Sequence, residues 1–273
     1  MDNKNVFVAI ALSMSVLLFW SAFFPPPEPT KKIVASQEKE KSTLNENNIL
    51  PNINESIQDK SISREQSIAA DKRIKIENDN IKGTLLLKGG IIDDVSFKSH
   101  KKDIKSGENI ILLNPKNTRD GYFVETGWTS IGNKIDVPNF NSQWNLVGNA
   151  NLTPNNPIIL EWKNKAGIIF KRKIEIDEKY LFNITQEVKN NSNESIDLYP
   201  YAQITRNKVP DDIQNFYISH EGFIGVFDEE LKEDDYDDIK EKKIVRDAND
   251  GWLGITDKYW ITAIVPEKGE NFK

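Results

Sequence analysis

The sequence predicts an antiparallel β-sandwich domain that is preceded by one transmembrane α-helix. Nineteen uncharged residues, Val6–Phe24, stand near the start of the chain. From Arg73 onward the sequence consists of short runs in which apolar and polar residues alternate, and turn residues separate these runs. Five of the six tryptophans lie in this part. Alternation without intervening helical patterns is typical of antiparallel sheets, and the tryptophans are expected to anchor a core between two of them.

The apolar segment Val6–Phe24 is expected to be a membrane anchor that is not cleaved. At about 1.5 Å of helix per residue it reaches about 28 Å, which is close to the thickness of a bilayer's hydrocarbon. A cleavable signal has a basic start, a shorter apolar core and a small-x-small site. Here Met1–Asn5 carries only one lysine, and bulky Phe23 and Phe24 separate the last small residues from a proline run. Residues 1–5 then form a short tail before the span, and the sequence of this segment leaves the side of the membrane open.

Residues 25–72 are expected to form a flexible linker. They contain a proline run followed mostly by Lys, Glu, Ser, Asn and Gln, with isolated isoleucines that follow no sustained period. Such a segment buries too little apolar surface to offset its ordering entropy. Roughly 40 residues of coil have a mean reach on the order of 35 Å. A short helix is predicted around Ser61–Ala70.

The folded domain, residues 73–273, is predicted to contain roughly a dozen short strands. The glycine pair Gly89-Gly90 predicts a tight hairpin turn between two of them. A second pair, Ile168–Ile176 and Tyr180–Val188, is joined by three polar residues, and its second strand alternates clearly. The other expected strands are Arg73–Glu77, Thr84–Leu87, Ile91–Phe97, Ile110–Leu113, Tyr122–Trp128, Gln143–Val147, Ile158–Trp162 and Ile196–Ile204.

Composition excludes several classes of function. The formal charge of −6 and the pI of about 5.2 argue against a nucleic-acid partner. The chain has no cysteine and only two histidines, which excludes thiolate metal sites and most histidine-based catalytic or zinc sites. We therefore assign no catalytic, cofactor-binding or metal-binding residue, and we expect neither a cofactor nor enzymatic activity.

Four features are candidate sites that we do not adopt. His100 lies among lysines and is interpreted as a surface-loop residue, while His220 could form half of an acid–base pair in a sugar-binding cleft. Asp228–Asp238 contains eight carboxylates but lacks the spacing of a calcium-binding loop, and it is interpreted as a solvated loop. Asn183 starts a glycosylation pattern inside a predicted strand, where the pattern carries little weight.

Several strings in the chain resemble the bacterial YidC membrane protein insertases. They are Met1–Asn5 with the span and prolines that follow, Ile81–Phe97 around its glycine pair, Ile174–Phe182, and Gly251–Trp260 leading to Val265-Pro266. Their shared order along the chain makes the resemblance specific.

This resemblance implies a cytoplasmic amino end, one span in the bacterial inner membrane, and a periplasmic β-sandwich similar to sugar mutarotases. It also implies a function in inserting and folding inner-membrane proteins, alone or with the Sec translocon. The periplasmic domain would be an accessory and docking element, with SecD–SecF among its partners alongside the bilayer and nascent membrane proteins. The family's five further spans, which form the insertase groove, are not matched, so no mechanistic residue carries over, and the β domain is expected to be incomplete at its carboxyl end.

An alternative remains open both for the orientation of the span in the membrane and for the function of the chain. Lysines are more numerous after the span than before it, which by the positive-inside rule favours the opposite orientation. Two alternative functions are a single-span envelope scaffold and a membrane-anchored carbohydrate-binding protein. The second alternative requires a histidine–carboxylate pair that faces a cleft.

Overall fold

The structure, a computed structural model, describes residues 12–15, 62–103, 105, 107–130, 135–211, 213 and 220–273. Residues 12–15 are helical. The remainder of the predicted span Val6–Phe24, and the linker as far as residue 61, lie outside the described residues. Within the described part of the chain, no helix is both long and apolar enough to cross a bilayer.

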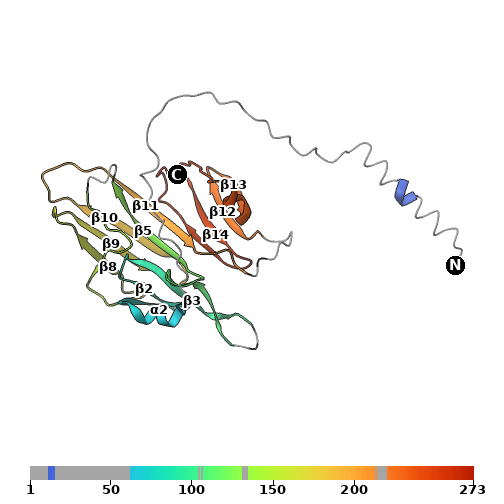
Figure 1. Cartoon of the computed structure of the whole chain (residues 1–273), viewed down its shortest axis with the longest axis horizontal. Helices are drawn as coiled ribbons and strands as arrows, with labels where there is room; N and C mark the ends of the chain where they lie inside the picture. Colours follow the sequence, from blue (N-terminus) through green and yellow to red (C-terminus); the bar gives the residue numbers. More distant parts are fainter. Residues whose placement is uncertain are drawn as a thin grey trace, which may run out of the picture. The chain divides into compact units, whose positions relative to one another are not determined.

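Most of the described chain is β-sheet, as predicted (Figure 1). A seven-stranded sheet has the order β11-β5-β3-β2-β1-β7, with β4 paired to β3. Its strands are β1 (Arg73–Glu77), β2 (Ile81–Leu86), β3 (Ile91–Lys101), β4 (Asn109–Leu113), β5 (Tyr122–Ser130), β7 (Asn151–Leu152) and β11 (Leu198–Arg206). All its pairings are antiparallel except the short one between β1 and β7.

A four-stranded sheet with the order β10-β9-β8-β6 forms the second layer. Its strands are β6 (Asn145–Val147), β8 (Ile158–Lys163), β9 (Ile169–Ile176) and β10 (Phe182–Lys189). The core lies between the two sheets, where Ile76 and Leu85 of the first join Leu160 and Phe170 of the second. Trp128 on β5 meets the Phe170 ring edge-on at 5.2 Å, so a tryptophan does anchor the core between sheets.

The predicted hairpin at Gly89-Gly90 is confirmed. Both glycines have positive φ, +83° and +65°, as a tight hairpin turn requires. The buried Arg172 of β9 donates hydrogen bonds from Nη1 to the carbonyl oxygens of Gly89 and Gly90, at 3.1 and 2.9 Å. A side chain at position 90 would meet that guanidinium at 2.5 Å, so the turn is held by close approach as well as by conformation.

The predicted pair Ile168–Ile176 and Tyr180–Val188 forms the β9–β10 hairpin, with Phe182 opposite Ile176. The second strand begins at Phe182, two residues later than predicted. The reason is local, because Asp177 Oδ1 accepts hydrogen bonds from the main-chain N–H groups of Lys179 and Leu181, at 2.8 and 2.9 Å. These bonds hold the chain in a turn before it can join the ladder.

The predicted short helix is α2 (Arg64–Ala70), which begins with a capping box formed by Ser63 and Gln66. It is fastened to the seven-stranded sheet by an ion pair between Arg64 and Asp94. Beside this pair, Arg73 and Asp93 form a buried bidentate ion pair at 2.6 and 3.0 Å. The Thr84 hydroxyl connects the two pairs, because it accepts from Arg73 and donates to Asp94.

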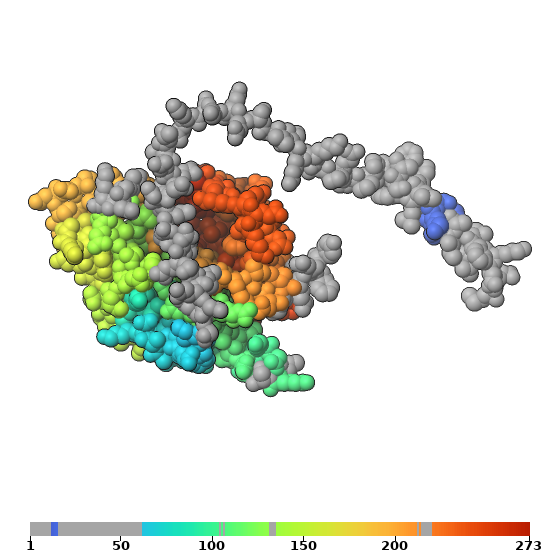
Figure 2. Space-filling view, viewed as in Figure 1, coloured from blue at the N-terminus to red at the C-terminus, as the bar shows by residue number. Residues whose placement is uncertain are grey.

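A third sheet, called here the carboxyl-terminal sheet, has the order β13-β12-β14-β15. Its strands are β12 (Gly222–Phe227), β13 (Glu230–Asp235), β14 (Gly251–Thr256) and β15 (Ile261–Ile264), and α3 (Tyr236–Glu241) follows β13. In the space-filling view its orange and red surface adjoins the green surface of the sandwich (Figure 2). Trp260 stacks on Phe97 of β3 at 4.3 Å, which ties this sheet to the core.

The interpretation of Asp228–Asp238 as a loop is wrong. Glu230–Asp235 pairs with β12 along its whole length, and the last residues begin α3. The carboxylates are mostly exposed, as expected, even though the segment takes part in a ladder. Strand pairing is compatible with charge here because β13 is an edge strand, where charged side chains face water.

Candidate functional site: a groove between β11, α3 and the carboxyl-terminal sheet

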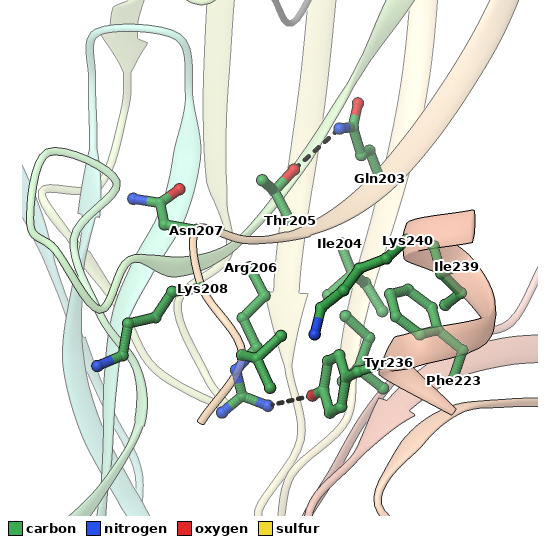
Figure 3. Close-up of a pocket in the computed structure, with 12 residues that line it drawn as sticks. Gln203, Ile204, Thr205, Arg206, Asn207, Lys208, Phe223, Tyr236, Ile239 and Lys240 are labelled. Atoms are coloured by element: carbon green, nitrogen blue, oxygen red, sulfur yellow. Dashed lines mark hydrogen bonds between the residues drawn. The ribbon is translucent and has the colours of Figure 1, made fainter. Parts of the chain in front are cut away.

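Arg206, the last residue of β11, is the centre of the contact between the sandwich and the carboxyl-terminal sheet (Figure 3). Its guanidinium donates two hydrogen bonds to Asp257, at 2.6 and 3.0 Å, and a third to the Tyr236 hydroxyl at 3.0 Å. It also lies over the Tyr122 ring, 4.4 Å from the centroid. Bidentate pairing and ring stacking are geometries that a lysine cannot reproduce, so this position is specific for arginine.

The electrostatics of this cluster favour a permanent ion pair over acid–base chemistry. Burial alone would lower the pKa of Arg206, but the hydrogen bond and the charge of Asp257 raise it above its usual value. Burial likewise raises the pKa of Tyr122 and of Tyr236. Arg206, Tyr122 and Tyr236 therefore keep one protonation state near neutral pH, and we call this cluster of side chains the clamp.

Next to the clamp is a groove of about 360 Å³. Its floor is apolar, with Ile204 of β11, Phe223 of β12 and Ile255 of β14. The α3 side chains Ile239 and Lys240 lie on the side of the groove opposite β11 (Figure 3). The other lining residues are Gln203, Thr205, Arg206, Asn207, Lys208, Val209 and Tyr236.

Each cation in the groove is already matched by a carboxylate. Besides the Arg206 clamp, Lys208 pairs with Asp120 and Asp211 at 3.1 and 2.5 Å. Lys240 pairs with Asp237 at 2.8 Å. The groove therefore offers an apolar floor and neutral polar walls, and it lacks the excess positive charge that an anion site needs.

His220 does not line this groove. Its Nε2 lies 2.9 Å from the carbonyl oxygen of Phe223, which can only accept, so Nε2 carries the proton. Its Nδ1 lies 3.6 Å from a carboxylate oxygen of Asp235. His220 therefore lies near a carboxylate, as the acid–base hypothesis requires, but its Nε2 is already hydrogen-bonded to the main chain.

The other candidate residues are placed as follows. His100 is exposed as expected, but it lies within β3 rather than in a loop, with its ring 4.9 Å from the Trp260 ring. Asn183 lies within β10, as predicted, and donates to Glu175 at 3.3 Å. Among the described residues, no group of three or more His, Asp or Glu side chains is arranged to hold a metal ion.

Sequence reasoning did not find the clamp or the groove. Arg206 and Asp257 are 51 residues apart in the chain, and neither belongs to a motif with fixed spacing. The one usable signal was Tyr236–Glu241, a short segment with acidic residues in its first turn and a lysine in its last turn, which is the charge order that a helix favours.

The fold is a β-sandwich domain with an added third sheet. Comparison with known proteins makes the assignment specific. The family model described as the YidC periplasmic domain matches residues 73–273. The chain therefore belongs to the YidC periplasmic-domain family.

Similarity to individual relatives extends over the whole chain. A protein named membrane protein insertase YidC from Pelagibacter ubique (strain HTCC1062) is 41% identical over 274 residues, which cover 100% of this chain and 48% of the relative. The protein of the same name from Rickettsia prowazekii (strain Madrid E) is 35% identical, with coverage of 100% and 48%. That from Cereibacter sphaeroides (strain KD131 / KCTC 12085) is 32% identical, with 99% and 45%. The chain thus spans about half the length of the curated relatives it matches.

Proposed function

We propose that this chain is the amino-terminal portion of a bacterial membrane protein insertase and chaperone. In this proposal residues 6–24 anchor it in the inner membrane, with residues 1–5 in the cytoplasm. The linker begins at residue 25 and ends before α2, rather than at residue 72 as the sequence predicts, because Arg64 fastens α2 to the seven-stranded sheet. Residues 73–273 form a periplasmic accessory and docking domain without enzymatic activity. The observation that carries the proposal is the match, along essentially the whole chain, to proteins that are named insertases.

The insertion step itself is assigned to the part of the relatives that this chain does not match. Moving a polar segment through hydrocarbon costs several kcal/mol for each charged or unsatisfied group. A water-filled groove within the membrane would lower that cost, but several helices are needed to enclose water. Among the described residues no helix is long and apolar enough to join the single span proposed for Val6–Phe24 in doing so.

Genetic complementation tests this division of labour. Residues 1–273 produced alone in a strain depleted of its insertase should not restore growth or the insertion of insertase-dependent proteins. Residues 1–273 fused to the unmatched portion of the Pelagibacter ubique relative should restore both. Rescue by residues 1–273 alone would contradict the assignment, and failure of a stable, membrane-inserted fusion would contradict the family function proposed for this chain.

The proposed partners are the bilayer, nascent membrane proteins and the Sec translocon, including SecD–SecF. Photo-crosslinking from exposed positions of the domain in the fusion protein tests the translocon contact. Orientation is tested by adding protease to cells with a permeabilised outer membrane. Digestion of residues 73–273 is expected under these conditions, and their protection would contradict a periplasmic location.

A further inference from the structure

The hairpin of β3 and β4 reaches beyond the strands beside it (Figure 1). β2 pairs with β3 only as far as Phe97, and the last residues of β3 continue the hairpin without β2. We call residues 98–103, 105 and 107–109 the basic tip. Its charged residues are four lysines and two carboxylates, namely Lys98, Lys101, Lys102, Lys105, Asp103 and Glu108. The basic tip is therefore positive, although the formal charge of the chain is −6.

The lysines nearest the end of the basic tip, Lys101, Lys102 and Lys105, are exposed. Lys98 lies nearer the sheet and is matched by Glu77 at 3.0 Å. The carboxylate of the tip's one aspartate accepts a hydrogen bond from a main-chain N–H of the turn at 2.7 Å. The excess of positive charge is small, so the attraction that the basic tip alone exerts on an anionic surface is weak.

Aromatic side chains flank the base of the basic tip. The His100 ring lies 4.9 Å from the ring of Trp260, in the turn between β14 and β15. In the same turn, Tyr259 is 73% exposed, and the Lys258 ammonium lies 5.3 Å from the centroid of its ring. An exposed tyrosine and a further lysine therefore lie beside the basic tip.

The linker joins the domain at the same strand. α2, which follows the linker, begins at Arg64, and this residue pairs with Asp94 of β3. From Asp94 to Lys101 the strand extends over about 23 Å. Figure 2 shows the cyan surface of α2 and the green surface of the basic tip at the same end of the domain. In the proposed function the linker leads to the membrane span, so this end of the domain is the nearest to the bilayer along the chain.

The residue types of this surface match anionic lipid better than a protein partner. Protein–protein interfaces are depleted in lysine and enriched in arginine, and every cation of the basic tip is a lysine. Each lysine near an anionic bilayer surface favours the bound state by about fivefold. Tyrosine and tryptophan are enriched at the membrane–water interface, where their rings lie at the level of the headgroups. A flexible linker raises the effective concentration of the surface, so that weak binding suffices.

We propose that the basic tip binds the anionic phospholipid headgroups of the bilayer to which the chain is anchored. This inference rests on the proposed function, which places the domain beside a bilayer. Electrostatic attraction of the lysines brings the hairpin to the headgroups. The contact gives the domain one preferred orientation at the membrane surface, with the end that carries α2 and the basic tip toward the lipid.

Lipid-dependent fluorescence quenching tests this contact in the whole chain. Residues 1–273 are reconstituted in nanodiscs of phosphatidylcholine alone or of phosphatidylcholine and phosphatidylglycerol in equal amounts, both with a nitroxide on some headgroups. The chain has no cysteine, so a fluorophore on Ser99→Cys reports on the basic tip alone. Its quenching is expected to be at least about twofold stronger in the anionic discs. Equal quenching in the two kinds of disc would overturn the proposal.

A second label, on Ser195→Cys, is the matched control. Like Ser99, Ser195 is an exposed serine, but it follows β10 at the other end of that strand. β10 starts near the base of the basic tip, where the Tyr180 ring lies 5.8 Å from Phe97, and it runs for eight residues before the loop that contains Ser195. The Ser195→Cys label should therefore be quenched equally in the two kinds of disc. A stronger quenching of this label in anionic discs, equal to that at Ser99→Cys, would overturn the assignment to the basic tip.

Two charge variants, each carrying the Ser99→Cys label, separate the basic tip from net charge. The tip variant has three substitutions, namely Lys101→Gln, Lys102→Gln and Lys105→Gln. The control variant makes the same change in charge at exposed lysines elsewhere, namely Lys163→Gln, Lys165→Gln and Lys189→Gln. The tip variant should lose the extra quenching in anionic discs, and the control variant should keep it. About 1 M salt should also abolish it, because the Debye length is then about 3 Å.

Circular dichroism and the unfolding midpoint verify that both charge variants are folded. Extra quenching that persists in a folded tip variant would overturn the proposal. Failure of the chain to enter the discs would instead contradict the anchor in the proposed function, whereas entry without approach of the basic tip contradicts this inference alone. The same label in a fusion protein whose unmatched portion is free of cysteine is expected to behave as in the chain. Loss of the quenching there would assign the basic tip to a contact with that portion, and would overturn the assignment to lipid.

Discussion

At the scale of single residues, Asn78 connects two separate turns. Its Oδ1 accepts from the N–H groups of Asn80 and Ile81, both at 2.8 Å, and shapes the β1–β2 turn. Its Nδ2 donates to the carbonyl oxygens of Asp177 and Lys179, at 2.8 and 2.9 Å, in the turn between β9 and β10. One buried amide therefore joins a turn of the first layer to a turn of the second.

Replacing Asn78 with alanine should consequently destabilise the domain. Four main-chain groups lose their partner, and since the site is nearly buried, we expect a loss of about 2–4 kcal/mol in the free energy of unfolding. Urea unfolding followed by tryptophan fluorescence measures it. Asn183→Ala on exposed β10 is the control and should change the free energy by less than about 0.5 kcal/mol. Equal effects of the two substitutions would contradict the role given to Asn78.

Glu77 provides a residue-scale prediction about pH. Hydrogen bonds from Lys75 and Lys98 lower the pKa of this carboxyl from 4.5 to about 2 in the folded chain. A folded-state pKa below the unfolded one adds stability at pH values above 4.5, and this contribution is lost as the pH falls toward 2. Between these pH values, Glu77→Gln should therefore lose less stability than the wild type, as measured by unfolding midpoints at each pH. Parallel pH profiles would contradict this assignment.

At the scale of elements, the turn between β2 and β3 combines a conformational and a steric requirement. Gly90 needs a positive φ, and a Cβ there would lie 2.5 Å from the guanidinium of buried Arg172. Gly148 has a φ of +90°, but a Cβ at that position would meet no atom within 4 Å. Backbone conformation and lack of space therefore both favour glycine at position 90, whereas backbone conformation alone favours it at position 148.

Comparing Gly90→Ala with Gly148→Ala separates these reasons. We expect Gly148→Ala to cost about 1 kcal/mol, the strain of a left-handed alanine. Gly90→Ala should cost about 1–3 kcal/mol more, because Arg172 has to leave its bonds to the turn carbonyls. Urea unfolding measures both variants, and similar costs would show that Arg172 adapts freely.

The elements also show where prediction from sequence ends. Alternation located β9 and β10, and the glycine pair located the β2–β3 turn, because these signals act over a few neighbouring residues. Glu230–Asp235 carries too little apolar alternation to reveal a strand, and it is held in the sheet by its pairing with β12. The groove was invisible for a related reason, since Ile204, Phe223 and Ile255 meet only after three distant segments fold together.

At the scale of the whole molecule, two polar contacts reinforce the apolar core that joins the described sheets. Asn78 joins the two layers of the sandwich, and the Arg206–Asp257 ion pair joins the carboxyl-terminal sheet to β11. Removing one partner of a partly buried bidentate ion pair is destabilising, because the remaining charge is left without its partner. Through its bonds to Asp257 and Tyr236, Arg206 therefore joins the end of β11 to both the carboxyl-terminal sheet and the start of α3.

The last prediction concerns the tether proposed for this domain. If Val6–Phe24 spans the bilayer, the chain should remain with the membrane pellet after carbonate extraction, whereas a chain that begins at Pro25 should be released. Two lysines introduced near the middle of the segment should also release the chain, because each costs about 2.5–3.5 kcal/mol or more in hydrocarbon. The far-ultraviolet circular dichroism of residues 73–273 should be unchanged in the released forms, which separates loss of the anchor from unfolding. Release of the unmodified chain by carbonate would contradict the anchor.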